Sequence, residues 1–266
     1  MRPPVLRLIA PMLAVALSAC GASQAGTASR ASTPAATPTL SPTAAPTPRV
    51  TVVDAAYLAT ELGGVEQGIR LPDSPAEEYL SLGRRALPAS IRSAVQANIS
   101  AAQQIDDLNG ASSALPHWRI IAPPAPEVLL SYYREVQQAY GIAWQYLAAI
   151  NLIETNMGRI QGLSSAGAQG PMQFMPATWA SYGRGDVNNP RDAILAAGRY
   201  LQAHGAPANM TRAIYAYNPS MLYVRAVQLY AEQMLASERA FLAYYNWEVY
   251  VQTKTGEVLL PEGFSG

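Results

Sequence analysis

Glu154 is the residue whose position in the sequence best suits acid–base chemistry. It ends an almost entirely apolar stretch that begins at Ala143, and it is the only carboxylate between Glu135 and Asp186. Such a stretch predicts a buried helix. Burial and the negative end of the helix dipole both raise the pKa of a carboxyl group placed there. A carboxylic acid that stays protonated near neutral pH suits general acid catalysis of glycosidic bond cleavage. The competing interpretation is that Glu154 lies at a frayed helix end and is exposed to water.

The acid begins one motif, a second motif follows it, and a third lies further along the chain. They read Glu154-Thr-Asn-Met-Gly-Arg159, then Ser164-Ser-Ala-Gly-Ala-Gln-Gly-Pro-Met-Gln-Phe-Met-Pro-Ala-Thr-Trp179, and finally Ala216-Tyr217-Asn218. In order and spacing this resembles the lytic transglycosylases of the lysozyme superfamily, and the Glu-Thr-x-x-Gly-Arg form is closest to the membrane-bound family B type. The resemblance covers about residues 125–236. It implies a lysozyme-like helical fold and peptidoglycan as the substrate.

The resemblance assigns roles to the polar residues. Glu154 would protonate the bridging glycosidic oxygen and then take a proton from the sugar's own hydroxyl group. Ser164 and Gln173 would hydrogen-bond near the acid or to sugar substituents. Tyr217 would direct its hydroxyl group at the glycan or at Glu154, and Asn218 would bind an amide or orient its loop. The competing interpretations are that Ser164 is a turn residue, that Gln173 is solvated at the surface and that Tyr217 is a core residue.

Smaller and apolar residues of the second motif have weaker assignments. Gly167 and Gly170 would let the backbone approach the glycan closely, with plain turn chemistry as the alternative. Met172 would form a wall of the cleft, with a position in the core as the alternative. Arg159 is the basic residue nearest to the acid in the sequence, and we expect it to face solvent, because near the carboxyl group it would lower the pKa.

The number of carboxylates near the motifs separates the activities that this fold supports. A glycoside hydrolase normally needs a second carboxylate, and the sequence offers only Asp186 and Asp192, neither of which lies in a motif. A transglycosylase needs one, because the C6 hydroxyl group of the sugar is an intramolecular nucleophile. We therefore expect cleavage of the MurNAc-β-1,4-GlcNAc bond with 1,6-anhydro-MurNAc ends. A lysozyme-type hydrolase and a non-catalytic peptidoglycan-binding lipoprotein are the alternatives.

The N-terminus has the features of a bacterial export signal. Arginines precede an apolar run from Leu8 to Leu17 that is too short to span a bilayer. The run ends in Leu17-Ser-Ala-Cys20, which resembles a lipoprotein lipobox, and Cys20 is the only cysteine. We expect Cys20 to be acylated and to anchor the protein outside the cytoplasmic membrane. The alternative is an ordinary signal peptide with an unrelated cysteine.

Composition excludes several classes of protein. Of the 266 residues, 50% are hydrophobic and 14% are charged, which is typical of a folded chain. Four of the 18 basic residues and none of the 18 acidic residues precede Val50, so the remainder is acidic and argues against a nucleic-acid partner. With one cysteine and two histidines we expect no metal site and no cofactor. The expected partners are peptidoglycan strands, with membrane contact only through the lipid anchor, and the expected state is a monomer.

Helical periodicity dominates the chain after the N-terminal region. It predicts helices over 52–62, 74–82, 88–108, 127–140, 143–155, 176–182, 190–204, 210–217 and 221–243. The tail from Trp247 predicts a β-hairpin that turns near Gly256. The expected fold class is mainly α, a lysozyme-like transglycosylase domain with a small C-terminal β-hairpin. The expected divisions are a signal peptide (1–20), a disordered Ala/Thr/Pro tether (21–50), a helical segment packed on the catalytic domain (51–125), the transglycosylase domain (126–245) and the hairpin tail (246–266).

Overall fold

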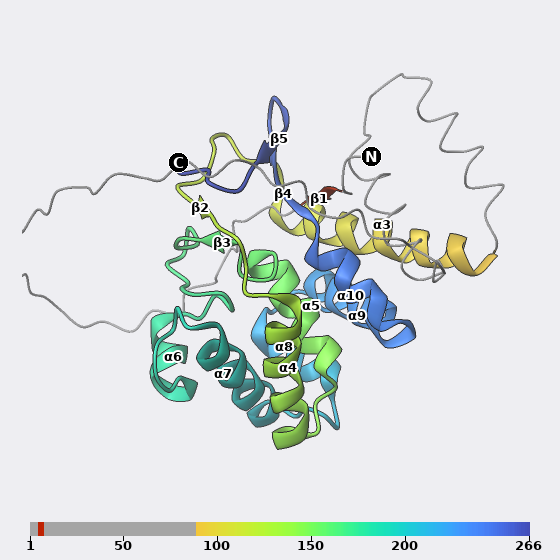
Figure 1. The fold of residues 1–266 in the computed structure, drawn as a ribbon, viewed down its shortest axis with the longest axis vertical. Helices are drawn as coiled ribbons and strands as arrows, with labels where there is room; N and C mark the ends of the chain where they lie inside the picture. The colour runs from red at the N-terminus through yellow and green to blue at the C-terminus, as the bar shows by residue number, and fades with distance from the viewer. Residues whose placement is uncertain (1–4, 8–88) are drawn as a thin grey trace, which may run out of the picture. The chain divides into compact units, whose positions relative to one another are not determined.

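The computed structural model describes residues 5–7 and 89–266, and helices dominate this part of the chain (Figure 1). The predicted helices over 52–62 and 74–82, the tether and the lipobox lie outside the described residues. The helices are α3 (Ala89–Asn109), α4 (Pro126–Tyr140), α5 (Trp144–Thr155), α6 (Pro176–Tyr182), α7 (Pro190–Ala203), α8 (Met210–Tyr217), α9 (Met221–Ala236) and α10 (Glu238–Tyr245).

One predicted helix is two helices in the structure. The sequence predicts a single helix over 221–243, whereas the chain leaves the helical conformation at Ser237, where φ is −154° and ψ is 125°. The Ser237 hydroxyl oxygen accepts a hydrogen bond from the backbone N–H of Arg239 and caps the new helix. The apolar pattern continues through the break because α9 and α10 both bury one face in the same core.

Helix α5 lies at the centre of the core and carries the predicted acid. Every residue from Leu147 to Thr155 is buried, which confirms the predicted buried helix. Such a helix needs neighbours on all sides, and α4, α7, α9 and α10 contact it. The last turn of α5 ends at Asn156, which has a left-handed backbone conformation with φ of 52°.

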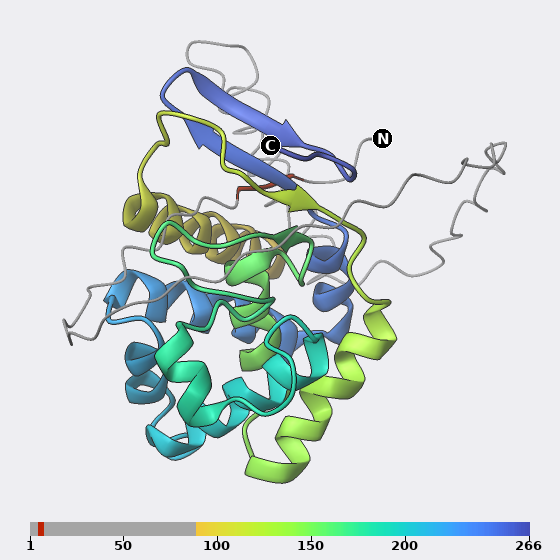
Figure 2. The ribbon, with the colours of Figure 1, turned by 90° about the vertical axis from the view of Figure 1, so that its left-hand side faces the viewer.

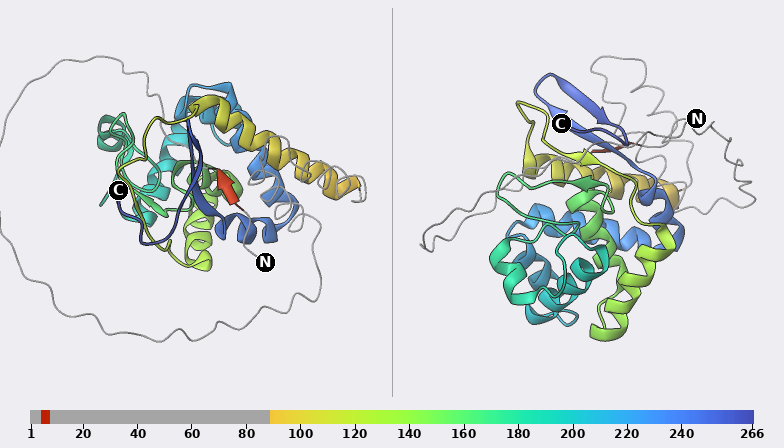
Figure 3. Two further views of the ribbon diagram at one scale, coloured as in Figure 1. Left: turned by 90° about the horizontal axis from the view of Figure 1, so that it is seen from above. Right: turned by 60° about the vertical axis from the view of Figure 1, so that its left-hand side comes forward.

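Helix α3 packs along α9, as the views in Figures 1 and 3 show. Its buried face follows helical spacing, with Ile91, Val95, Ala102 and Ile105 on one side. Asn98 is also buried on this face, and its side-chain oxygen accepts a hydrogen bond from the Tyr244 hydroxyl group of α10. This bond links α3 to α10, far away in the sequence.

The C-terminal tail forms the predicted hairpin, and the fold class is therefore mainly α with a small β-hairpin. Strands β4 (Glu248–Thr253) and β5 (Gly256–Leu260) pair antiparallel, and β1 (Val5–Arg7) pairs parallel with β4. The hairpin lies beside the end of α3, where Ser112 exchanges backbone hydrogen bonds with Gln252 and Lys254 (Figure 2). No helix within residues 89–266 is both long enough and apolar enough to cross a membrane.

A second, very short strand pair was not predicted. Strand β2 (Arg119–Ile120) pairs antiparallel with β3 (Ile160–Gln161), with Arg119 opposite Gln161. Two residues are too few to produce an alternating pattern in the sequence. The pair fixes the connector between α3 and α4 against the loop that follows α5.

Candidate active site

Glu154 lies in the last turn of α5 with only 7% of its surface exposed. The hydroxyl group of Tyr223, a fully buried residue of α9, donates a hydrogen bond of 2.6 Å to Oε1 of Glu154. Within residues 89–266 the other carboxyl oxygen, Oε2, has no hydrogen-bond partner. One oxygen is therefore held by the protein and the other is left for a ligand.

Burial controls the protonation of this carboxyl group. It raises the pKa of Glu154 from 4.5 to about 8, although the hydrogen bond from Tyr223 favours the charged form and partly opposes the rise. Glu154 is therefore protonated over most of the neutral range. This confirms the predicted direction of the pKa shift and identifies desolvation as its leading cause.

A buried hydrogen-bond network joins the end of α5 to the second motif. The hydroxyl group of Thr155 and the amide nitrogen of Asn151 both donate to the backbone carbonyl of Pro171, at 2.6 and 2.8 Å. The hydroxyl group of Tyr133 donates to Oδ1 of Asn151 at 2.6 Å. Because these groups are all buried, an unpaired one would be costly. The network fixes the position of the Pro171 segment relative to the neighbouring Glu154.

The rest of the first motif attaches α5 to the C-terminal part of the chain. The side-chain amide of Asn156 donates to the carbonyl of Trp247 at 2.9 Å. The guanidinium group of Arg159 donates to the carbonyl of Tyr245 at 2.7 Å and lies over that ring, 5.4 Å from its centroid. Arg159 is half-buried there, so the expectation that it faces solvent is wrong. The guanidinium group of Arg159 is instead bound to the carbonyl of Tyr245 at the end of α10.

The loop from Gly170 to Gln173 approaches other backbone segments closely. A Cβ atom at Gly170, where φ is +72°, would lie 2.0 Å from the carbonyl oxygen of Val187, so packing within the protein requires glycine here. Gln173 also has a left-handed conformation, with φ of 49°, and its side chain donates to the carbonyl of Gly170 at 2.9 Å. Such a conformation is uncommon for a residue with a side chain and is often found at functional sites.

Met172 does not line a cleft, contrary to the sequence-based expectation. Its side chain is fully buried and belongs to the hydrophobic core. The backbone carbonyl of Met172 instead accepts a hydrogen bond of 2.6 Å from the hydroxyl group of Tyr217. Met172 therefore supports the site through its main chain.

Tyr217 lies near the acid but does not hold it. Burial is the main cause that raises the pKa of Tyr217, and the charge of Glu154 adds to the rise. The ring is half-buried, with edge-on contacts to Phe174 and Tyr200 at 6.0 and 5.5 Å between centroids. The next residue, Asn218, ends α8, and its backbone N–H donates to Ile214.

Ser164 and Gly167 form a turn ahead of the Pro171 loop. The hydroxyl oxygen of Ser164 accepts hydrogen bonds from the backbone N–H groups of Ala166 and Ala168, at 3.3 and 2.9 Å. Gly167 has φ of +85° and open space where a Cβ atom would be. The contacts of Ser164 within the described chain are thus those of a turn serine, while Gly167 leaves its backbone accessible.

The two other carboxylates considered in the sequence bond within their own loop. The carboxylate of Asp192 accepts from the backbone N–H of Asp186 at 3.0 Å, and that of Asp186 accepts from the backbone N–H of Asn188 at 2.9 Å. Neither is among the groups that shift the pKa of Glu154. In residues 89–266, no cluster of three or more acidic, histidine or cysteine side chains is placed to hold a metal ion.

Tyr223 is the site residue that the sequence analysis missed. It belongs to none of the three motifs and follows Tyr217 by six residues, on the buried face of α9 with Val224, Val227 and Tyr230. The sequence did offer one signal for Tyr223, its residue type, because a tyrosine on a buried helix face needs a hydrogen-bond partner for its hydroxyl group. The identity of that partner depends on how α5 and α9 pack.

The raised pKa of Glu154 predicts a specific effect on stability. Between pH 4.5 and about 8 the folded protein keeps a proton that the unfolded chain loses, so the free energy of unfolding falls as pH rises through this window. At about 1.4 kcal/mol per pKa unit, the fall amounts to roughly 3–5 kcal/mol.

Glu154→Gln should lack this fall in the free energy of unfolding. Urea unfolding should find it more stable than wild type at pH 8 and above, with the difference shrinking toward pH 4.5. Glu232→Gln, at an exposed position of α9, is the matched control; parallel profiles for wild type and Glu154→Gln would contradict the burial argument.

The hydrogen bond from Tyr223 can be tested by titration. Tyr223→Phe removes the group that favours the charged carboxylate, so the pKa of Glu154 should rise further. Carbon-13 NMR of the glutamate side chains over pH measures this directly. Tyr217→Phe is the matched control, because its hydroxyl group bonds to Met172, and it should shift the pKa of Glu154 much less. An unchanged or lowered pKa in Tyr223→Phe would show that the bond does not act on the acid.

Comparison with known families agrees with this geometry. Residues 131–238 match the family model described as the Transglycosylase SLT domain. No curated protein matches the chain. The matched segment runs from within α4 to the first residue of α10, and it includes Glu154, the Pro171 loop and Tyr223. Residues 131–238 are therefore similar to the SLT domains of the lysozyme-like lytic transglycosylase superfamily.

Proposed function

We propose that the protein is a lytic transglycosylase that cleaves the MurNAc-β-1,4-GlcNAc bond of peptidoglycan and leaves 1,6-anhydro-MurNAc ends. The observation that carries the proposal is a single buried carboxyl group, Glu154, protonated near neutral pH, with one oxygen held by Tyr223 and the other free within the described chain. It lies inside an SLT domain, the family of which suggests this activity on peptidoglycan.

One carboxyl group can perform both halves of this reaction. The proton on Oε2 of Glu154 passes to the bridging oxygen as the bond between that oxygen and C1 of MurNAc breaks. The resulting carboxylate then takes the proton of the C6 hydroxyl group while O6 forms a bond to C1. No water is consumed and the acid is regenerated. The hydrogen bond from Tyr223 stabilises the charged form that exists between the two steps.

The surroundings of the acid favour this reaction over hydrolysis. A hydrolase would use a second carboxylate to activate water or to act as a nucleophile. Asp186 and Asp192 accept backbone hydrogen bonds within their own loop. A lone acid suits an intramolecular nucleophile, because the C6 hydroxyl group is already attached to the reacting sugar.

The proposed glycan contacts come from the loops next to the acid. Gln173 is half-buried with a strained backbone conformation, and Tyr217 is half-buried with its hydroxyl group on the same loop. Asn218 is half-buried beside Tyr217, and Gly167 leaves open space around its backbone. Ser164 would contribute by shaping the turn that presents Gly167.

The acid–base assignment is tested by Glu154→Gln. Glutamine keeps the size of the side chain but has no proton to donate, and general acid help is worth about 10²–10⁴-fold. Because the same group also acts as the base, we expect the loss to lie at the upper end of that range. Purified peptidoglycan would be digested and the released muropeptides analysed by mass spectrometry after borohydride treatment.

Wild type should release products one water lighter than lysozyme products and resistant to borohydride reduction. Glu232→Gln, the same substitution on an exposed face of α9, should retain full activity. Reducible ends would replace the proposal with the hydrolase alternative. Full activity of Glu154→Gln would end the catalytic assignment, and glycan binding without any product from wild type would favour the non-catalytic alternative.

We further propose that Cys20, which lies outside the described residues, is lipidated and holds the enzyme outside the cytoplasmic membrane. The support is the position of the only cysteine at the end of the apolar export signal. Acyl chains on Cys20 would provide the anchor. Cys20→Ala should therefore move the protein from the membrane to the soluble fraction, as measured by cell fractionation. Ser23→Ala, outside the lipobox, is the control, and a membrane-bound Cys20→Ala would require a different anchor.

A further inference from the structure

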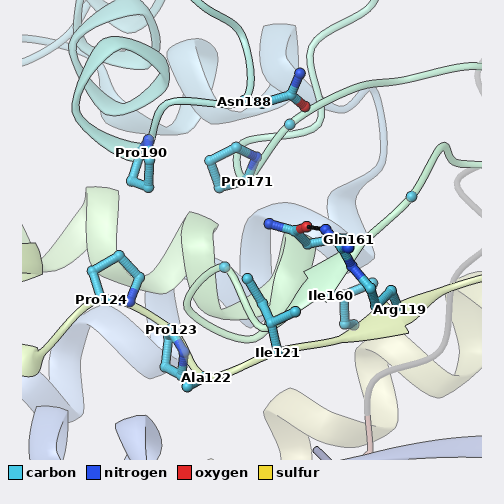
Figure 4. A pocket seen from close by; sticks show the side chains of 13 residues that line it. Arg119, Ile121, Ala122, Pro123, Pro124, Ile160, Gln161, Pro171, Asn188 and Pro190 are labelled. Atoms are coloured by element: carbon cyan, nitrogen blue, oxygen red, sulfur yellow. Dashed lines mark hydrogen bonds between the residues drawn. The ribbon is translucent and has the colours of Figure 1, made fainter. Parts of the chain in front are cut away.

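A cavity of about 720 Å³ lies beside the acid but is not lined by it (Figure 4). One wall is the connector that runs from Arg119 to Pro124, and the facing walls come from the loop after α5, from Gly170 and Pro171, and from the start of α7. Its volume is in the range of sites that bind small molecules. Of its lining residues, only Gly170 was expected from the sequence to approach the glycan, and packing against Val187 accounts for that glycine.

The connector makes this cavity a feature of this chain and not of the SLT domain alone. Residues 119–124 precede the segment that matches the family, which begins at residue 131. The β2–β3 pair places Arg119 directly opposite Gln161, which lies within the matched segment. A residue outside the domain and a residue inside it therefore form one end of the cavity together.

The polar groups at this end are hydrogen-bond donors. Nη2 of Arg119 donates to Oε1 of Gln161 at 2.6 Å, which turns the amide nitrogen of Gln161 toward the space between Pro171 and Ile121 (Figure 4). In the described part of the chain, Arg119 has no carboxylate partner and the amide nitrogen of Gln161 has no acceptor. A guanidinium group beside an unused amide N–H pair favours a ligand with a carboxylate.

The remaining walls are apolar and already formed. Pro123, Pro124, Pro171 and Ile121 face the cavity (Figure 4), and proline rings hold their backbone conformation. The wall at Gly162 is tightly packed, because a Cβ atom there would lie 2.9 Å from the Trp118 ring. No aromatic side chain lines the cavity, so it offers no platform for stacking a sugar. Short aliphatic groups fit these surfaces better.

We propose that this cavity binds the stem peptide of a peptidoglycan strand, with a peptide carboxylate at Arg119 and Gln161. The identity of the ligand rests on the proposed function. Gly158, which lines the cavity, follows Glu154 by four residues, so their α-carbons are within about 15 Å. An extended peptide of about four residues spans a similar length, roughly 14 Å. A peptide attached to a sugar near Glu154 can therefore reach the wall of the cavity that Gly158 forms.

Peptide binding is tested without any need for catalysis. The probe is a synthetic tetrapeptide of the peptidoglycan stem with free carboxylates, titrated into the full chain and followed by NMR. Arg119→Ala removes the cation, and Gln161→Glu keeps the size of the side chain but repels a carboxylate while it pairs with Arg119. Each should weaken binding roughly ten- to a hundredfold. Arg225→Ala, at an exposed position of α9, is the matched control and should bind as wild type does.

The same peptide with amidated carboxylates should bind weakly to wild type. No binding by wild type, or equal binding by Arg119→Ala or by the amidated peptide, would overturn the proposal. In activity assays, Arg119→Ala should slow cleavage of peptide-bearing strands and leave peptide-free glycan strands unaffected, whereas an equal loss on both would also overturn it. A chain that binds the peptide but cleaves neither substrate would refute the proposed function and not the peptide site.

Discussion

The burial of a carboxyl group is the constraint on which the rest of this structure depends. To keep Glu154 buried at the end of α5, the helix must be enclosed along its length, and α4, α7, α9 and α10 provide that enclosure. The same burial raises the pKa of the acid to about 8 and costs stability wherever the folded protein must ionise it. Tyr223 moderates this cost from α9 with a hydrogen bond to one oxygen. The acid, its pKa and the packing of the helices are thus consequences of one arrangement.

The motif that contains the acid mainly attaches other segments of the chain to the end of α5. Thr155 holds the carbonyl of Pro171, Asn156 holds that of Trp247, and Arg159 holds that of Tyr245. All three partners are backbone carbonyls from segments distant in the sequence, so the motif collects those segments around the last turn of α5. A substitution in the motif can therefore displace the loops beside the acid without touching a substrate. The spacing of the residues in this motif therefore reflects the hydrogen-bonding geometry at the end of α5 as much as the chemistry of the acid.

Local patterns predicted the features that depend on local physics. The apolar run before Glu154 was sufficient to predict a buried helix and a raised pKa, and alternation in the tail was sufficient for the hairpin. Features that depend on tertiary packing were missed or wrong. Tyr223 meets Glu154 across 69 positions of sequence, and Arg159 meets Tyr245 across 86, so nothing near either residue indicated its partner. Met172 was misplaced because a motif gives the order of residues but not which side chain points inward.

The loop at Pro171 connects the two ends of the proposed substrate site. Its carbonyl is bound by α5 next to Glu154, while its ring faces the cavity that ends at Arg119 and Gln161. On its other side, Gly170 packs directly on the carbonyl of Val187, so the loop cannot shift toward α7 without a backbone clash. Because the loop is held on both sides, the distance between the acid and the cavity is set by the fold and not by the ligand. A rigid separation of this kind selects substrates in which a carboxylate and a scissile bond are a fixed length apart.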